Sequence, residues 1–241
     1  MTSDAPNLPE HVPTLPVEAR AAPPPDDPVA AQLRGFGPLG LLAILIIVLT
    51  SVVKPLSALL VLLWAWRSHT PWREIGYVRP KSWLGSLAVG IVFGCVFKLL
   101  MKAIVMPLLG APAINPAYHY LVGNRAALPG LVFTMIVGAG FGEETIFRGY
   151  MFERLGTLFG NGAGAKVFIV LLTSTVFALG HYSNLGLPGV EQAMITGLVF
   201  GTVFAVTGRI WMLMCAHAAF DLIAVAIIYM NLESAVAHMV F

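Results

Sequence analysis

Charged residues are scarce in this sequence of 241 residues. Only 11% are Asp, Glu, Lys or Arg, whereas 58% are hydrophobic, and the mean hydropathy is +0.83. A soluble globular domain carries about 25% charged residues, because its surface must face water. The shortage of charge therefore excludes an ordinary soluble domain and indicates a multi-pass integral membrane protein that contacts membrane lipid.

Cysteine content and net charge are also low. The two cysteines, Cys95 and Cys215, both lie in apolar runs, so no disulfide framework is predicted. The formal net charge of +2 gives no indication of a nucleic-acid partner. The sequence leaves the oligomeric state open.

The first 34 residues differ from the rest of the chain. They hold eight of the seventeen prolines, with Pro23, Pro24 and Pro25 in a row, and five acidic residues against Arg20 and Arg34. Such a segment buries too little apolar area to offset its ordering entropy, and it lacks the basic start and apolar core of a signal peptide. We predict a disordered tail over 1–34 and a helical membrane domain over 35–241.

The membrane domain is predicted to be an all-α, polytopic transmembrane helical bundle. At about 20 residues per span it has about seven spans, with six to eight allowed by length. The segment 55–66 is either a full span or a half-helix. The apolar segments are 36–53, 55–66, 83–109, a fourth that begins near Leu128, 166–181, 190–207 and 210–230.

Basic residues between these segments are unevenly distributed. Only Arg125 falls clearly on the side opposite to the others. The positive-inside rule places the larger set in the cytoplasm. That set is Arg67, Arg73, Arg79, Lys81, Arg154, Lys166 and Arg209.

Ionisable residues inside apolar segments are energetically costly and indicate function by default. The first cluster is EETIFR at 143–148. Glu144 and Arg148 are four residues apart, so they share a helix face and are expected to pair. Glu143 points about 100° away and is expected to be free to act as a general base. A structural ion pair beside a carboxylate in a water pocket is the alternative.

Two further clusters contain histidine. In FALGH at 177–181, one helical turn separates Phe177 from His181, so the ring is expected to pack beside the imidazole. In HAAFD at 217–221, His217 and Asp221 share a helix face. Each histidine alone is compatible with a satisfied core residue, but three polar clusters in successive apolar regions favour a functional site.

Together these groups can activate water. A carboxylate and an imidazole deprotonate it for attack on a carbonyl, while a second imidazole and another polar group hold the oxyanion. No serine or cysteine nucleophile is needed. The same set can also ligate zinc, although HExxH is absent; we favour metal-free chemistry with no cofactor and keep zinc as the alternative. The residues of the set are Glu143, His181, His217 and Asp221.

The depths of these residues in the membrane impose a condition. His181 lies about 22 Å along the helix axis from Lys166, at about 1.5 Å per residue. The acids match this depth if the fourth helix continues past Arg148 toward Phe159, or if the fifth segment is tilted or re-entrant.

The three motifs, in this order, resemble those of the CPBP family (CAAX protease and bacteriocin-processing, or Abi), a group of intramembrane endopeptidases. The family patterns are EExxxR, FxxxH and Hxxx followed by Asn or Asp. The similarity covers roughly residues 60–230, and GYVRP at 76–80 is like a common pre-motif of the family.

The resemblance implies roles for the six motif residues. Glu143 and His181 would activate the attacking water, and Arg148 would hold Glu144 as a brace. His217 and Asp221 would occupy the oxyanion side. Asp221 departs from the asparagine of the prenyl-protein proteases, and an ionised carboxylate would repel an oxyanion. This departure favours a protonated acid, a brace or a metal ligand at that position.

The resulting hypothesis is an intramembrane endopeptidase in a bacterial inner membrane. Its substrate would be a membrane-associated peptide or lipidated protein, including prenylated CAAX-type proteins. A peptide-binding or bacteriocin self-immunity protein on the same fold is the first alternative. A proton-coupled transporter is the second, but the sequence has no internal repeat. Retention of the glutamates, arginine and histidines of the three motifs favours the enzyme.

Overall fold

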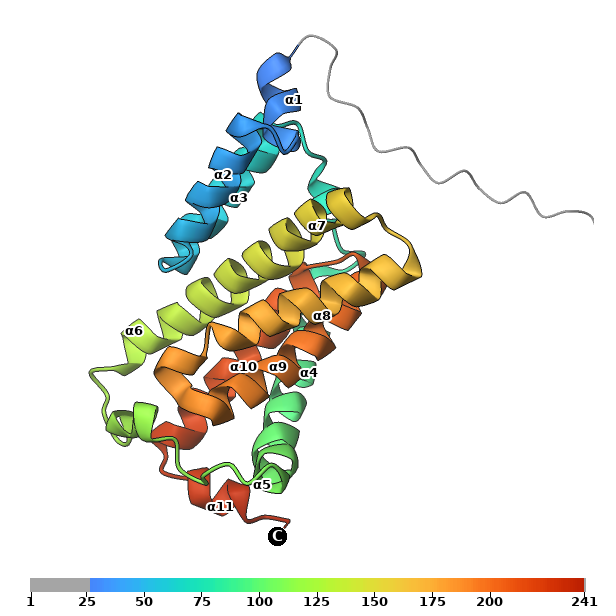
Figure 1. Ribbon diagram of the computed structural model, residues 1–241. Coiled ribbons are helices and arrows are strands. Elements are labelled where there is room, and N and C mark those ends of the chain that lie inside the picture. The colour runs from blue at the N-terminus through green and yellow to red at the C-terminus, as the bar shows by residue number, and fades with distance from the viewer. Residues whose placement is uncertain (1–26, 241) are drawn as a thin grey trace, which may run out of the picture.

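The computed structural model describes residues 27–240, and within them every regular element is a helix (Figure 1). The predicted all-α fold is confirmed. The first half contains α1 (Pro28–Arg34), α2 (Pro38–Thr50), α3 (Lys54–Arg67), η1 (Trp72–Ile75), α4 (Trp83–Leu100), η2 (Met101–Val105), α5 (Met106–Leu108) and η3 (Pro116–Leu121). The second half contains α6 (Leu128–Phe133), η4 (Thr134–Glu143), η5 (Thr145–Met151), α7 (Phe152–Phe159), α8 (Ala163–Leu179), α9 (Tyr182–Thr207), α10 (Trp211–Tyr229) and α11 (Glu233–Ala237).

Each predicted apolar segment forms a helix, but not every helix is long enough to span a bilayer. Within the described residues, four are long and apolar enough, or five if α1 and α2, bent by 56°, count as one span. They are Trp83–Leu108, Leu128–Phe159, Tyr182–Thr207 and Trp211–Tyr229. The number is below the expected seven because α2, α3 and α8 have 13, 14 and 17 residues, whereas a span needs about 20.

The predicted disordered tail extended too far along the chain. Its last residues form α1, where the Asp27 carboxylate accepts a hydrogen bond from the Ala30 N–H and pairs with Arg67 at 2.7 Å. The Arg67 guanidinium and the Ala30 N–H lower the pKa of Asp27 to about 2. Composition could not reveal this cap or its distant partner. The remainder of the predicted tail, 1–26, lies outside the described residues.

Basic loops that are far apart in the sequence meet at one end of the bundle. The Ile210 N–H donates to the Gly76 carbonyl at 3.0 Å, which joins the loop before α10 to the loop after η1. The Lys166 ammonium donates to the Ala205 carbonyl at 3.0 Å, which joins the start of α8 to the end of α9. This clustering agrees with the predicted charge asymmetry, while its cytoplasmic side stays a prediction.

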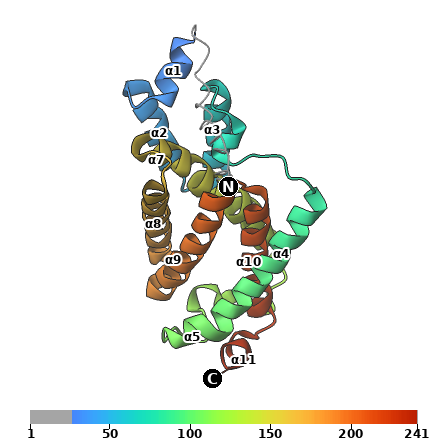
Figure 2. The same ribbon diagram turned by 90° about the vertical axis from the view of Figure 1, so that its right-hand side faces the viewer.

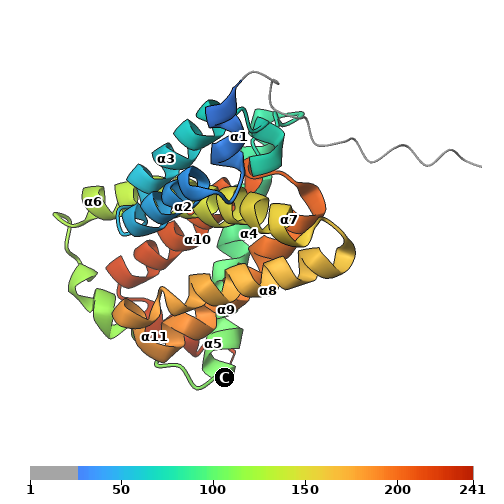
Figure 3. The same ribbon diagram turned by 45° about the horizontal axis from the view of Figure 1, so that its top comes forward.

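The bundle depends on two close helix pairs. Helix α4 crosses α10 with extensive contact (Figure 2), and α8 runs beside α9 (Figure 3). At Gly90, an added Cβ would lie 2.6 Å from the Cys215 Cβ, and at Gly94 it would meet the Ala216 carbonyl. Glycine is therefore required for α4 to approach α10 this closely.

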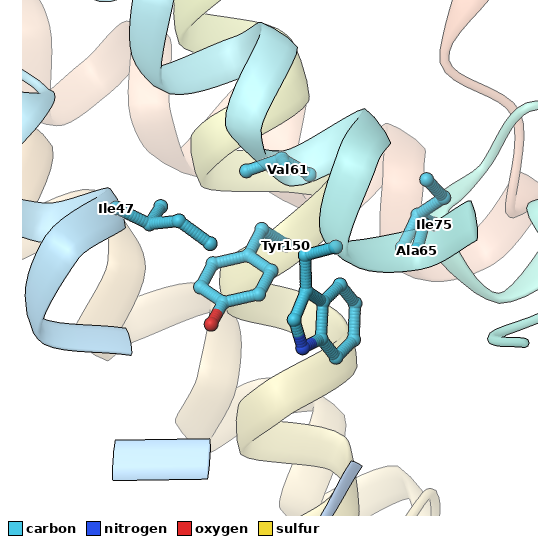
Figure 4. Packing of buried hydrophobic residues seen from close by; sticks show 6 residues of the cluster. Ile47, Val61, Ala65, Ile75 and Tyr150 are labelled. Carbon is cyan, nitrogen blue, oxygen red and sulfur yellow. The ribbon is translucent and has the colours of Figure 1, made fainter. Parts of the chain in front are cut away.

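A hairpin of α2 and α3 packs against the long helix through the aromatic residue Tyr150. Tyr150 lies among Ile47, Val61 and Trp64, and its ring meets the Trp64 indole edge-on at 4.9 Å between centroids (Figure 4). The Ser57 hydroxyl donates to the Ile47 carbonyl at 2.8 Å and joins the two arms. The hairpin is thus held in a defined position against η5.

Replacing Gly94 by Leu should force α4 away from α10. Overpacking of this kind costs about 1–3 kcal/mol, so we expect Gly94→Leu to lower the Tm in detergent by several degrees. Gly130→Leu is the matched control, because no atom outside its own helix turn lies within 4 Å of a Cβ there. An equal fall in Tm for both variants would contradict the close contact.

Candidate active site

A cavity of about 560 Å³ lies between the helices that carry the three motifs. Its volume is typical of a ligand-binding site. Of the six motif residues, four line it: Glu143, His181, His217 and Asp221. Glu143 ends η4, His181 lies in the turn between α8 and α9, and α10 supplies the other two. The structure therefore brings the predicted water-activating set into the lining of one cavity.

The long helix Leu128–Phe159 explains how these residues meet. Glu143 and Glu144 lie at its midpoint, and the helix continues past Arg148 to Phe159, as one of the two sequence-based alternatives requires. Around the acids its geometry is π-helical, in η4 and η5. Wider helical turns of this type occur often at functional sites.

Glu144 is fully buried and has two partners on one oxygen. The Arg148 guanidinium donates to Oε1 at 2.8 Å, which confirms the predicted pair, and His217 Nδ1 lies 2.6 Å from the same atom. A carboxylate oxygen accepts, so His217 carries its proton on Nδ1. The brace therefore orients an imidazole on another helix, as well as an arginine on its own.

Glu143 was predicted to be free, and this was wrong. Its Oε1 lies 2.6 Å from the Lys54 ammonium, which comes from the first residue of α3. Only 8% of Glu143 is exposed. A buried carboxylate needs a partner, and here the partner is 89 residues away in the sequence. Residue spacing within one helix cannot reveal a partner that lies on another helix.

The two histidines present the same nitrogen to the cavity. His181 Nδ1 lies 2.8 Å from the Phe177 carbonyl, which accepts only, so Nδ1 carries the proton. His217 Nδ1 is likewise occupied by Glu144. In the neutral form of each ring, Nε2 is therefore a bare acceptor. His217 Nε2 lies 3.7 Å from Glu143 Oε2 and 3.8 Å from Asp221 Oδ2.

Aromatic rings hold these polar groups in place. Phe177 packs beside His181 with 4.7 Å between ring centroids, as its spacing predicted, and also meets His217 edge-on at 6.0 Å. The Arg148 guanidinium lies 5.0 Å from the centroid of Phe177 and 5.6 Å from that of Phe200. These cation–π contacts stabilise a buried charge without adding another ion.

The GYVRP stretch is linked to the acidic helix by a short hydrogen-bond chain. The Thr145 hydroxyl donates to the Phe141 carbonyl at 2.7 Å, so the Tyr77 hydroxyl, 2.7 Å from Thr145 Oγ1, must donate to it. Burial raises the pKa of Tyr77 to about 12, so the phenol stays neutral and keeps its donor. Gly76, at φ +80°, permits the turn under Phe204.

Several other polar residues line the cavity, and the sequence reasoning did not assign them to it. Lys98 is buried, donates to Gln192 at 2.9 Å and lies 4.7 Å from the centre of the Phe220 ring. Lys102, which also lines the cavity, pairs with Glu233 at 3.2 Å. The signal was available, because lysines inside an apolar segment are as costly as acids.

A preformed metal site is not found in the part of the chain that the structure describes. No three His, Cys, Asp or Glu side chains are grouped there in a way that holds a metal ion. The Lys54 ammonium occupies one side of Glu143. The metal-free mechanism and its zinc-dependent alternative both stay predictions.

Comparison with known families agrees with the motifs. The family model of the type II CAAX prenyl endopeptidases, Rce1-like, matches residues 125–223. These residues are similar to that family and are called the Rce1-like segment below. All six motif residues lie within the Rce1-like segment, and the predicted resemblance is confirmed. No curated protein and no solved structure matches the chain. The match and the apolar helices identify an integral membrane protein and support a membrane protease role.

Replacing Arg148 by Met should strongly destabilise the Rce1-like segment, because it removes a partner of the fully buried Glu144. Breaking a buried ion pair in this way costs about 3–5 kcal/mol. The double variant Glu144→Leu, Arg148→Met should lose less stability than the single variant, since it removes both charges. Thermal and denaturant unfolding in detergent measure both effects.

The exposed Arg209 provides the control, and Arg209→Met should change stability by less than about 0.5 kcal/mol. A double variant whose loss of stability equals the sum of the losses in the single variants Arg148→Met and Glu144→Leu would show that the two charges do not depend on each other.

Proposed function

We propose that this protein is a glutamate-dependent intramembrane endopeptidase that hydrolyses a peptide bond of a membrane-associated substrate. The observation that carries the proposal is that Glu143, His181 and His217 line a common cavity. The Glu143 carboxylate and two imidazoles whose Nδ1 atoms are already hydrogen-bonded line one space there. The family match supports the same reaction class.

In the proposed reaction, water attacks the carbonyl carbon of the scissile bond. Glu143 Oε2 takes one proton of the water, while His181 Nε2 accepts a hydrogen bond from the other and orients the oxygen. The water oxygen bonds to carbon and gives a tetrahedral oxyanion. When this collapses, the C–N bond breaks and the proton held by Glu143 passes to the leaving nitrogen, so acid and amine products are complete.

The oxyanion would be held by His217 in its doubly protonated form. One N–H donates to Glu144 and the other, on Nε2, points toward Glu143 and Asp221 and is available to the oxyanion. Asp221 then acts as a brace for the imidazolium rather than as an oxyanion donor. This role agrees with an aspartate at a position where the prenyl proteases of the family carry asparagine.

The proposed substrate class is a peptide or protein with a lipid anchor, of which a prenylated CAAX-type protein is the first candidate. Such an anchor would bring the scissile bond to a cavity inside the bundle. Cavity volume supports a short peptide segment as the enclosed part. The lipid would then remain in the bilayer.

Cleavage of quenched prenylated and plain peptides by the purified protein tests the proposal. We expect wild type to cleave the prenylated peptide, and Glu143→Gln and His181→Ala each to lower kcat at least about 100-fold, since general acid–base catalysis contributes about 10²–10⁴. Activity should survive a zinc chelator.

Each contrary outcome has a distinct meaning. Loss of activity with chelator and recovery with added zinc would overturn the metal-free mechanism. Tight binding of the peptide without cleavage by folded wild type would favour the peptide-binding alternative. Unchanged kcat in Glu143→Gln would remove the proposed base.

A further inference from the structure

The ion pair between Lys54 and Glu143 has no assigned role in the proposed reaction. Lys54 is the first residue of α3, at the tip of the α2–α3 hairpin, and lines the cavity. Its ammonium lies 2.6 Å from Glu143 Oε1, and its side chain is 35% exposed while that of Glu143 is 11% exposed. The lysine is therefore the more exposed partner of this ion pair.

The fold positions this lysine tightly. An added Cβ at Gly142 would lie 2.9 Å from the Lys54 Cβ and 3.2 Å from the Lys54 carbonyl oxygen, so only glycine allows the tip of the hairpin this close to η4. Tyr150, two turns along, anchors the arms of the hairpin. Both contacts fix the direction from which Lys54 approaches the carboxylate.

The two oxygens of Glu143 consequently have different surroundings. Lys54 occupies Oε1, whereas Oε2 faces His217 Nε2 at 3.7 Å. A carboxylate held at one oxygen by an ammonium cannot rotate freely, so its other oxygen keeps one direction. That second oxygen is the one available to take a proton.

We propose that Lys54 is a positioning residue for the reaction: it holds Glu143 in its ionised form with Oε2 directed toward His217 and the substrate. The inference rests on the proposed function. Without the ammonium, Oε1 of this buried carboxylate would lose its ion-pair partner at 2.6 Å, and Glu143 would keep only the more distant His217 Nε2, 3.7 Å from Oε2. A buried carboxylate that loses its close partner binds a proton more readily, and a protonated acid is no longer a base.

The test is the kinetics of prenylated-peptide cleavage by Lys54 variants. We expect Lys54→Met to lower kcat about 10- to 100-fold, within the range that general-base catalysis contributes, with KM changed less than about threefold. Lys54→Arg should keep most of the wild-type activity, because arginine also provides a cation that donates to carboxylates. If Lys54 had a purely structural role, folded Lys54→Met and Lys54→Arg would have the same kcat.

Chemical rescue provides a second, independent readout. Lys54→Cys is prepared in a Cys95→Ala, Cys215→Ala background, whose own activity is the reference, and is treated with 2-bromoethylamine. Aminoethylation places an ammonium at the end of the side chain at position 54 without changing the rest of the chain. We expect treatment to raise the kcat of Lys54→Cys at least about fivefold toward that of the reference. This rise would recover part of the rate that general-base catalysis contributes.

Two variants serve as controls for folding and for charge. Ser51→Ala changes the tip of the hairpin, where the Ser51 hydroxyl donates to the Val48 carbonyl at the end of its own helix, and Arg209→Met removes an exposed cation. Both should cleave at the wild-type rate.

The outcomes distinguish this inference from the proposed function. If wild type cleaves, Glu143→Gln is inactive and Lys54→Met cleaves normally, the role of Lys54 is overturned while the protease stands. If Lys54→Met is inactive and neither Arg nor aminoethylation restores cleavage, the positioning role is also overturned. If wild type cleaves no peptide, both proposals fail together.

Discussion

The charge of Glu144 at the centre of the long helix is the constraint on which the site depends. A carboxylate with no exposed surface is tolerated only with cationic or hydrogen-bonding partners, and Arg148 and His217 share one of its oxygens. Because His217 belongs to α10, satisfying this charge also fixes α10 against η4 and η5. Because Glu144 holds Nδ1 of His217, Nε2 of the same ring is turned toward Glu143 and Asp221. One desolvated acid thus determines the orientation of a second helix.

The opposite side of α10 is fixed by packing rather than by charge. Gly90 and Gly94 bring α4 against the residues that flank His217, so α10 is held between a glycine surface and a buried ion pair. Phe200 and Phe177 fill the space around the imidazole and the guanidinium. Polar groups in such a dry setting interact more strongly than they would in water, because the surrounding dielectric is low.

Local spacing predicted much of this arrangement, and long-range pairing accounts for what it missed. The apolar segments follow from continuous hydrophobic runs, and the Glu144–Arg148 pair and the Phe177–His181 contact follow from residues one helical turn apart. Lys54 could not be found in this way, since only the folded hairpin brings it to η4. The helix α1 was missed for a related reason, because a cap and a partner at Arg67 stabilise a segment whose composition indicates disorder.

The hairpin also limits how the Rce1-like segment can function alone. Residues 125–223 supply every acid and imidazole of the proposed reaction, but the ammonium at Glu143 comes from residue 54. Helices α2 and α3 have 13 and 14 residues, about 20 Å each, which is shorter than the roughly 30 Å hydrocarbon core. Their tip nevertheless reaches the midpoint of the long helix. A half-length hairpin is therefore sufficient to deliver a cation to the buried acid, and this favours the half-helix alternative for 55–66.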